Sequence, residues 1–387
     1  MRITHVITRL IIGGAQENTL SSVLGLRQKP GLEVKLVSGP STGPEGSLES
    51  LDPQLQIIPD LVRPVHPLKD MRGLRELERF FRESRPEIVH THSGKAGVLG
   101  RLAAARAGVP IIVHTIHGPS FGKFQGALSN FIFRAAERRA GRVTTHFVTV
   151  ADAMTEQYLA AGIGRRGQYT KIFSGFNLAP FLAAKNDPQF RAKLGIAPED
   201  IVIGKIARLF KLKGHDDLFR AAPELVRRNP RVKFLLVGDG EWREKFENKT
   251  RELGLERNVI FAGLVQPGDV PRYVGVMDAL VHLSLREGLP RALPQALAAG
   301  KPVVAYDCDG AREACRDGDT GFLVQAGDLN SLTNKLSLLI DNPQTRERLG
   351  KAGQAFVKEN FSVERMVDDL HALYLKLATA RRNRQHG

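Results

Sequence analysis

The sequence of 387 residues carries a net charge of +15, and 42% of its residues are hydrophobic. This length exceeds one typical core and predicts two soluble domains of roughly 150–200 residues each. No apolar run approaches the ~20 residues that cross a bilayer, so we expect no membrane-spanning helix. Cys308 and Cys315 are expected to be free thiols in a reducing compartment. We therefore expect a cytoplasmic protein.

The basic charge requires either an anionic partner or a merely solvated basic surface. The candidate partners are nucleic acid, an anionic membrane surface and anionic small molecules. The sequence carries no zinc-finger, helix-turn-helix or RNA-binding signature, and only 6% of its residues are aromatic. We therefore expect no nucleic-acid partner, while the other two partners and the solvated surface remain open.

The first elements of the chain are typical of a Rossmann-like unit. Residues 3–8 predict a buried strand, Gly13 and Gly14 a turn, and the residues from Ala15 onward a helix. Because neither glycine carries a side chain, a ligand can approach the backbone closely at this turn. The turn lacks the G-x-G-x-x-G spacing, so it does not predict a dinucleotide site.

Histidines gather where two further strands of the first half are predicted to end. They are His90, His92, His114 and His117. Open α/β sheets bind ligands at the carboxyl ends of their strands, so we expect a polar active-site role for His117, with a structural role as the alternative. His90 ends a buried strand and is expected to be structural. No metal-binding motif accompanies the histidines, and we expect no metal.

Residues 123–142 combine an apolar helix face with a dense positive charge. The residues that would share the apolar face are Phe124, Leu128, Phe131 and Ala135. The positive side chains are Lys123, Arg134, Arg138, Arg139 and Arg142. An amphipathic helix that faces anionic lipid fits this pattern, and so does a packed helix with a solvated basic side.

The second half opens with a predicted strand over residues 201–208, and two cations follow. Arg208 and Lys213 stand between this strand and a helix, where they can hold a diphosphate and stabilise the charge of a departing one. A later strand ends in the turn at Gly238, which we expect at the same rim of the sheet.

The stretch from Ser284 to Glu313 predicts a loop, a helix, a strand, a loop and a helix. Glu287 lies beside Gly288 in the first loop, and Pro290 precedes the first helix, as proline does in many helices. The start of a helix at the rim of a parallel sheet attracts phosphate. A carboxylate at the same rim is well suited to hold sugar hydroxyls.

This stretch resembles the signature of the retaining, GT-B-fold glycosyltransferases of family 4. That signature reads E-G, six more residues, a second Glu, then A-x-A-x-G-x-P-V-V and G-x-x-E. Glu287-Gly288, residues 300–304 and residues 310–313 match it, and Arg208 with Lys213 matches the family's R-x4-K pair. One position departs, because Gln295 stands in place of the second Glu.

The resemblance implies an α/β protein with two Rossmann-like, doubly wound domains that face each other across a cleft. Residues 1–180 would form the acceptor-side domain and residues 190–360 the donor-binding domain, with a helix near 362–380 returning to the first. The implied activity is a metal-independent, retaining transfer of sugar from a UDP- or GDP-linked donor to a glycan or lipid-linked acceptor, with no cofactor. A nucleotide-sugar epimerase of the same architecture and a non-catalytic nucleotide-binding protein are the alternatives.

The resemblance also implies roles for single residues. Arg208 and Lys213 would hold the diphosphate, and Glu287 would bind the hydroxyls of the donor sugar. Gln295 would meet the ribose, where the loss of charge is expected to weaken binding or alter the nucleotide preference. His117 would contact the donor sugar near the reaction centre. The remaining donor-binding positions would be Gly13, Gly14, Gly238, Gly288, Leu289 and Pro290. A protein at the inner face of a membrane, held there through residues 123–142, remains an open expectation.

Overall fold

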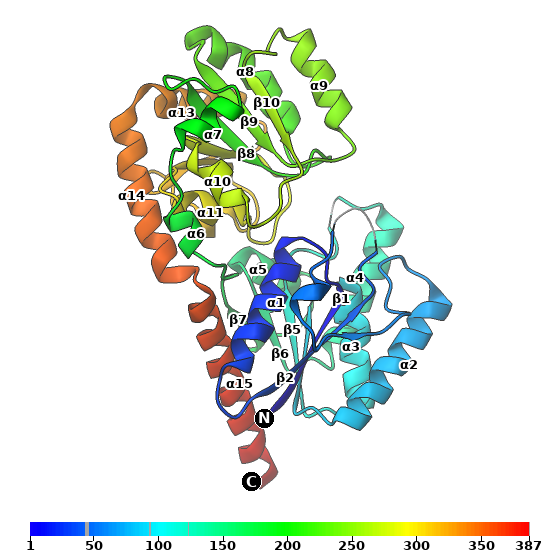
Figure 1. The fold of residues 1–387 in the computed structure, drawn as a ribbon. Coiled ribbons are helices and arrows are strands. Elements are labelled where there is room, and N and C mark those ends of the chain that lie inside the picture. The colour runs from blue at the N-terminus through cyan, green and yellow to red at the C-terminus, as the bar shows by residue number, and fades with distance from the viewer. Residues whose placement is uncertain (43–45, 93, 123, 387) are drawn as a thin grey trace. The chain divides into compact units, whose positions relative to one another are not determined.

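The computed structural model describes residues 1–42, 46–92, 94–122 and 124–386, which form two compact α/β units. The first unit consists of Met1–Phe176 and Val363–Gly387, and the second of Asn177–Ser362. The chain therefore leaves the first unit once and returns to it with the final helix, which is drawn in red in Figure 1.

The first unit is built on a parallel sheet of seven strands in the order β3-β2-β1-β4-β5-β6-β7. The chain order reverses between β1 and β4, and an open α/β sheet has its ligand crevice outside the carboxyl ends of such strands. The strands are β1 (Arg2–Arg9), β2 (Glu33–Gly39), β3 (Gln56–Ile57), β4 (Ile88–His92), β5 (Ile111–Ile116), β6 (His146–Thr149) and β7 (Tyr169–Lys171).

Helices cover both faces of this sheet, and each face has its own hydrophobic core. One core joins the sheet to α1 and α15, and the other joins it to α2 and α3. The helices are α1 (Gly14–Arg27), η1 (Glu49–Leu51), α2 (Pro67–Ser84), α3 (Gly94–Arg106), α4 (Ala127–Gly141), α5 (Asp152–Ala160), η2 (Arg166–Gln168) and α15 (Val363–His386).

The second unit is built on a parallel sheet of six strands in the order β10-β9-β8-β11-β12-β13. The chain order reverses between β8 and β11, which places the segments after these two strands side by side. The strands are β8 (Ile201–Ile206), β9 (Val232–Val237), β10 (Val259–Gly263), β11 (Ala279–His282), β12 (Val303–Tyr306) and β13 (Gly321–Val324).

The core of the second unit joins the strands to α8, α9 and α13, whereas the buried Leu293 and Leu297 of α11 lie outside that core. Helix α8 turns its apolar residues to the core at helical spacing, as in Leu218, Ala222 and Leu225. The helices are α6 (Ala179–Leu182), α7 (Pro188–Lys193), α8 (His215–Arg228), α9 (Arg243–Glu252), α10 (Val270–Gly275), α11 (Ala292–Ala298), α12 (Ala311–Ala314), α13 (Leu329–Asp341) and α14 (Pro343–Asn360).

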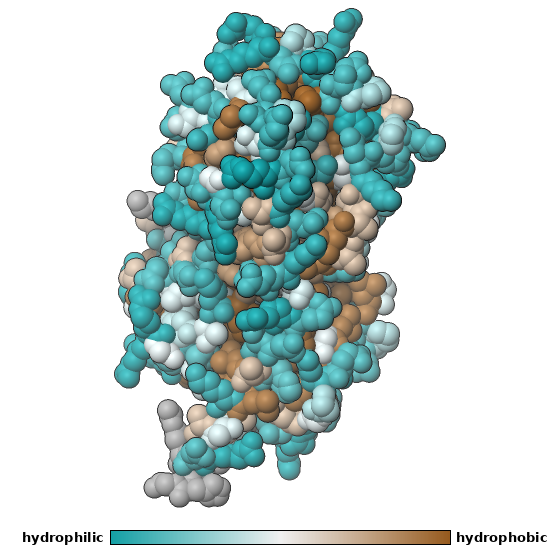
Figure 2. All heavy atoms as spheres, turned by 90° about the vertical axis from the view of Figure 1, so that its left-hand side faces the viewer, coloured by the Kyte–Doolittle hydropathy of each residue, from teal (hydrophilic) through white to brown (hydrophobic). Residues whose placement is uncertain are grey.

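The two parallel α/β sheets confirm the fold class that the sequence predicted. Hydrophilic residues cover most of the surface seen in Figure 2, and hydrophobic residues appear there between them. Within the described ranges, no helix is long and apolar enough to cross a membrane.

Candidate active site

The loops that follow β8 and β11 in the second unit are bound to each other through their backbones. Leu285 N–H donates to Leu212 O over 2.9 Å, and the Ser284 hydroxyl donates to the same oxygen over 3.3 Å. Gly214 has a left-handed conformation with φ 66°, and a Cβ there would lie 2.0 Å from Leu283 O. Glycine is therefore required at this position, where the first loop approaches β11 and turns into α8.

This contact between loops brings two of the predicted site residues together. Lys213 Nζ lies 2.5 Å from Glu287 Oε1, and the two side chains are 21% and 20% exposed. The backbone N–H of Glu287 also donates to Asp309 Oδ2 over 2.8 Å, and Gly310 N–H donates to Gly288 O over 3.1 Å. The loops after β8, β11 and β12 thus hold the carboxylate in place.

Glu287 is ionised because two neighbouring bases outweigh its burial. Burial alone would raise the pKa of this carboxyl, but His282 and Lys213 hold the pKa well below its usual range. His282 Nε2 lies 3.5 Å from Glu287 Oε1, which is the long limit of a hydrogen bond, so we treat this pair as an electrostatic contact. The site therefore presents a fixed negative charge beside the Lys213 ammonium.

Arg208 lies in the same loop as Lys213 but does not join this ion pair. Its side chain is exposed, and its guanidinium carbon lies 5.6 Å from the centre of the Phe210 ring. Among the described residues it forms no ion pair with Glu287. The structure thus brings Lys213 and Glu287 together and leaves Arg208 as a solvent-accessible cation nearby in sequence.

Three buried bases near the ion pair were missed by the sequence analysis. They are Lys205 on β8, His215 at the start of α8 and His282 at the end of β11. Among the described residues, Lys205 Nζ and both ring nitrogens of His215 have no hydrogen-bond partner. Burial, followed by repulsion from Lys213, lowers the pKa of Lys205 to about 7. A lysine inside an otherwise apolar strand was the signal that could have found this group.

The other predicted positions of the second unit have varied surroundings. Leu289 and Pro290 are buried, and Gln295 is half-buried on α11. At Gly238, with φ 133°, a Cβ would lie 2.2 Å from Ala207 O. This glycine is required because the turn after β9 packs against the backbone beside Arg208.

The predicted positions of the first unit lie at the carboxyl ends of its strands. Strand β1 ends at Arg9, and helix α1 begins at Gly14, directly after Gly13. His117 follows β5 and is half-buried, and its Nε2 lies 3.0 Å from Nδ1 of His92. His92 is fully buried at the end of β4, so His117 is anchored to the interior.

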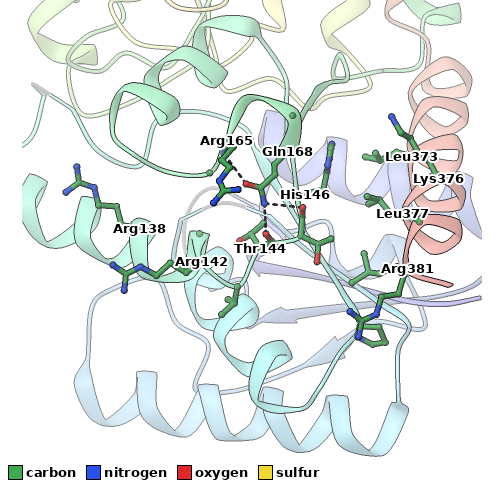
Figure 3. A pocket seen from close by; sticks show the side chains of 18 of the residues that line it. Arg138, Arg142, Thr144, His146, Arg165, Gln168, Leu373, Lys376, Leu377 and Arg381 are labelled. Atoms are coloured by element: carbon green, nitrogen blue, oxygen red, sulfur yellow. Dashed lines mark hydrogen bonds between the residues drawn. The ribbon is translucent and has the colours of Figure 1, made fainter. Parts of the chain in front are cut away.

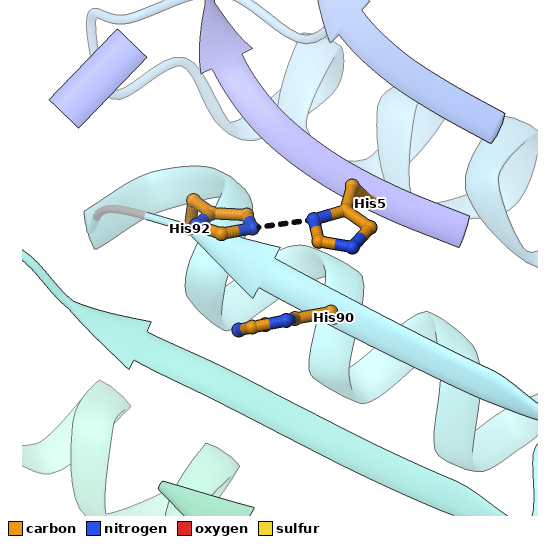
Figure 4. A group of neighbouring side chains, drawn as sticks. All are labelled: His5, His90 and His92. Atoms are coloured by element: carbon orange, nitrogen blue, oxygen red, sulfur yellow. Dashed lines mark hydrogen bonds between the residues drawn. The ribbon is translucent and has the colours of Figure 1, made fainter. Parts of the chain in front are cut away.

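Three histidines meet in the interior of the first unit, and the sequence analysis missed one of them, His5 on β1. Nitrogen atoms of His5, His90 and His92 lie within 4.8 Å of one another, which makes these three side chains a candidate metal-binding group. However, His5 Nδ1 and His92 Nε2 are hydrogen-bonded over 2.9 Å, and the ring of His90 is stacked on that of His92 with centroids 4.4 Å apart (Figure 4). The nitrogen lone pairs of stacked rings lie in separate, nearly parallel planes and therefore do not converge on one ion. This geometry favours a hydrogen-bonded cluster over a metal site.

A cavity of about 1220 Å³ lies at the other end of this sheet, where β5 and β6 begin. Its lining includes the starts of β5 and β6 and side chains between Leu373 and Arg381 of α15 (Figure 3). The basic side chains around it are Arg138, Arg142, Arg165, Lys376 and Arg381. Because ligands of open α/β sheets bind at the carboxyl ends of the strands, we do not assign the active site to this cavity.

Comparison with known proteins gives matches over nearly the whole chain. Residues 186–356 match the family model described as "Glycosyl transferases group 1", and residues 13–170 match "Glycosyl transferase 4-like domain". The chain is 27% identical over 386 residues to the UDP-Gal:alpha-D-GlcNAc-diphosphoundecaprenol alpha-1,3-galactosyltransferase of Escherichia coli, with 97% of each chain covered. It is 24% identical to the capsular polysaccharide biosynthesis glycosyltransferase CapM of Staphylococcus aureus, with 90% of each chain covered.

Solved structures share the fold. The crystal structure of Anabaena Alr3699/HepE in complex with UDP-glucose superimposes with a TM-score of 0.81 at 24% identity, and covers 97% of this chain and 100% of that one. The sucrose-phosphate synthase of Thermosynechococcus elongatus superimposes with a TM-score of 0.79 at 20% identity, and covers 98% of this chain and 100% of that one.

Proposed function

The chain belongs to the group 1 glycosyl transferases of family 4 type with the GT-B fold, and from this premise we propose a specific reaction for it. It transfers a hexose from a UDP-linked donor to a lipid-linked glycan, retains the anomeric configuration and needs no metal ion. Relatives that are named as transferases favour this activity over an epimerase or a non-catalytic binder.

The observation that carries the proposal is the contact between Lys213 and Glu287 at the carboxyl ends of β8 and β11. A nucleotide sugar has an anionic diphosphate directly attached to a neutral, hydroxyl-rich ring. A cation beside a carboxylate complements these two parts, because the ammonium attracts phosphate and the carboxylate accepts hydrogen bonds from hydroxyls. In the free protein the two groups form an ion pair with each other, and this ion pair breaks when the donor binds.

The reaction then depends mainly on stabilising the leaving group. Lys213 and Arg208 carry the positive charge that meets the departing diphosphate, the task for which other transferases use a metal ion. Glu287 holds the sugar hydroxyls, and His117 also contacts the sugar. The acceptor attacks from the side of the leaving group, whose phosphate oxygen takes the acceptor's proton. Gln295 contacts the ribose without a charge.

The proposed acceptor is a glycan linked to a lipid diphosphate, since the Escherichia coli relative is named for transfer to N-acetylglucosamine on diphosphoundecaprenol. Helix α4 supplies a surface that fits a membrane substrate. Leu128, Phe131 and Ile132 are 73%, 70% and 52% exposed, and Arg139 on the same helix is exposed as well. Exposed apolar side chains beside cations bind the surface of an anionic bilayer. Lys123, which the sequence analysis included in this segment, lies outside the described residues.

The direct test incubates the protein with a polyprenyl-diphosphate-linked N-acetylglucosamine acceptor and, in turn, UDP-galactose, UDP-glucose or GDP-mannose. We expect release of UDP that depends on the acceptor, a product of the same anomeric configuration as the donor by NMR, and no loss of rate with EDTA. An inverted product, or a rate abolished by EDTA and restored by a divalent metal, would overturn the proposed mechanism.

Two variants and one control test the assigned residues. Lys213→Ala and Glu287→Ala are expected to lower kcat/KM by at least ~100-fold, the usual scale for losing one electrostatic stabiliser of a transition state. Lys211→Ala is the matched control, because Lys211 is an exposed cation of the same loop. Circular dichroism of each variant separates a loss of chemistry from a loss of fold. Full activity in folded Lys213→Ala would refute the assignment.

A further inference from the structure

Five hydrogen bonds connect six side chains of the first unit into one buried chain that ends at His117. We call it the imidazole chain, and its members in order are Thr115, His90, Tyr374, His5, His92 and His117. Its links are Thr115 Oγ1–His90 Nε2 (2.6 Å), His90 Nδ1–Tyr374 Oη (2.5 Å), Tyr374 Oη–His5 Nε2 (3.2 Å), His5 Nδ1–His92 Nε2 (2.9 Å) and His92 Nδ1–His117 Nε2 (3.0 Å). Figure 4 shows the link between His5 and His92 above the ring of His90.

The interior imidazoles of this chain are neutral. Burial, assisted by the positive charge of Arg27, lowers the pKa of His5 to about 3. Burial, followed by repulsion from neighbouring imidazoles, also lowers the pKa of His90 and of His92 well below the ordinary value. A neutral imidazole has one N–H donor and one acceptor nitrogen, and a phenol or hydroxyl donates one hydrogen. The oxygen of Tyr374 could accept from both His90 and His5, but the hydroxyl hydrogen of this fully buried side chain would then have no acceptor in the chain. Tyr374 therefore donates in one link and accepts in the other, and two proton arrangements remain.

The Thr115 end of the chain selects one of these arrangements. Thr115 is 3% exposed, and among the described residues its hydroxyl has His90 Nε2 as its hydrogen-bond partner. If His90 donated to Thr115, the hydroxyl hydrogen would be buried without an acceptor, which costs free energy. The hydroxyl therefore donates to His90, and every later member donates toward His117. His92 Nδ1–H then donates to His117 Nε2, so the proton of neutral His117 is on Nδ1.

We propose that the imidazole chain is a positioning device that holds His117 as the neutral Nδ1–H tautomer, which presents an N–H donor to an oxygen of the bound nucleotide sugar. Tyr374, His5 and His92 are positioning residues in this scheme, because they act only through His117. The role toward the sugar rests on the proposed function, whereas the control of the tautomer does not.

The chain also opposes protonation of His117. An imidazolium carries a hydrogen on both nitrogens, so its Nε2–H would face Nδ1–H of His92 at 3.0 Å. Two donors that face each other repel, unless every link reverses as far as Thr115.

The test uses Tyr374→Phe, which removes one oxygen and cuts the chain between His90 and His5. The matched control is Tyr169→Phe, which removes a hydroxyl bonded to Ile163 O over 2.7 Å at the edge strand β7, outside the imidazole chain. Two-bond 1H–15N NMR of the ligand-free full chain, labelled at histidine, identifies the tautomer of His117. We expect Nδ1–H in the wild type and in Tyr169→Phe, and a mixture of both tautomers in Tyr374→Phe.

Kinetics with the nucleotide sugar give the second measurement. Tyr374→Phe is expected to lower kcat/KM by roughly 3- to 10-fold, the scale of one weakened hydrogen bond, with Tyr169→Phe unchanged. An Nε2–H tautomer in the wild type, or an unchanged tautomer in Tyr374→Phe, would overturn the proposal. If the tautomer responds but the wild type transfers no sugar, the proposed function fails and the structural control of His117 stands. If His117→Ala leaves kcat/KM unchanged in an active enzyme, the role toward the sugar is refuted.

Discussion

The ion pair between Lys213 and Glu287 should contribute a measurable coupling energy to the stability of the second unit. Two unit charges about 4 Å apart attract by about 4 kcal/mol near a protein surface, and desolvation of both ions offsets part of that attraction. The Nζ–Oε1 distance here is 2.5 Å, and the side chains are 21% and 20% exposed. Between an exposed and a buried pair, we expect a coupling energy of about 1–3 kcal/mol.

The assay is a double-mutant cycle of Lys213→Ala, Glu287→Ala and the combined variant, followed by denaturant unfolding. Trp242 is the single tryptophan of the chain and packs against the core of the second unit, so its fluorescence reports unfolding of that unit. A coupling energy within error of zero would refute the reasoning, because the two side chains would then be independent in solution.

The pH dependence of the same cycle provides an internal check. The folded state holds the pKa of Glu287 below its ordinary value through His282 and Lys213. The stabilisation that ionised Glu287 contributes is therefore fully present above about pH 4.3, the pKa of this carboxyl in the unfolded protein. It is lost as the pH falls toward the lower pKa of Glu287 in the folded protein. The coupling energy should shrink below about pH 4, and a coupling that grows on acidification would contradict the charge assignment.

Three further predictions concern groups outside this pair. Lys205→Met should raise the free energy of unfolding by about 1–3 kcal/mol because it removes a buried charge. This gain in stability should become smaller as the pH rises from 7 to about 10, because in that range Lys205 is neutral in the folded protein and still protonated in the unfolded protein. Phe131→Ser should weaken sedimentation with phosphatidylglycerol vesicles, whereas Leu264→Ser, an equally simple loss of an exposed apolar side chain on the second unit, should not. Glu137→Ala should destabilise the first unit by about 3–5 kcal/mol, because it strands the fully buried Arg101 that Glu137 pairs with over 2.6 Å, and thermal unfolding measures the loss.

Much of the fold could be predicted because the apolar runs of the sequence and the glycine turns between them indicate the same strands. Buried apolar runs bounded by glycine turns mark the strands, and the residues at their carboxyl ends mark one rim of each sheet. Lys213 and Glu287 follow strands that are far apart in the sequence, and they meet because β8 and β11 are neighbours in the sheet. Only the resemblance to a known fold supplied that adjacency in advance.

The sequence could not reveal the imidazole chain, since its links depend on contacts between distant segments. Tyr374 reaches His5 and His90 only because α15 returns to the first unit after the whole second unit has been built. Nothing near His5 in the sequence signals a partner 369 positions away. Lys205 did carry a signal, as a charge within an apolar strand, and its unpartnered amine gives that signal a physical meaning.

The affinity of Glu287→Ala for UDP and for the UDP-linked sugar tests the central claim most directly, by isothermal titration calorimetry against the wild type. If Lys213 binds the diphosphate and Glu287 the sugar, the variant should bind UDP at least as tightly as the wild type, because its ammonium no longer has a competing partner. It should at the same time lose the extra affinity that the sugar provides. Equal weakening of UDP and of the UDP-linked sugar would contradict the account.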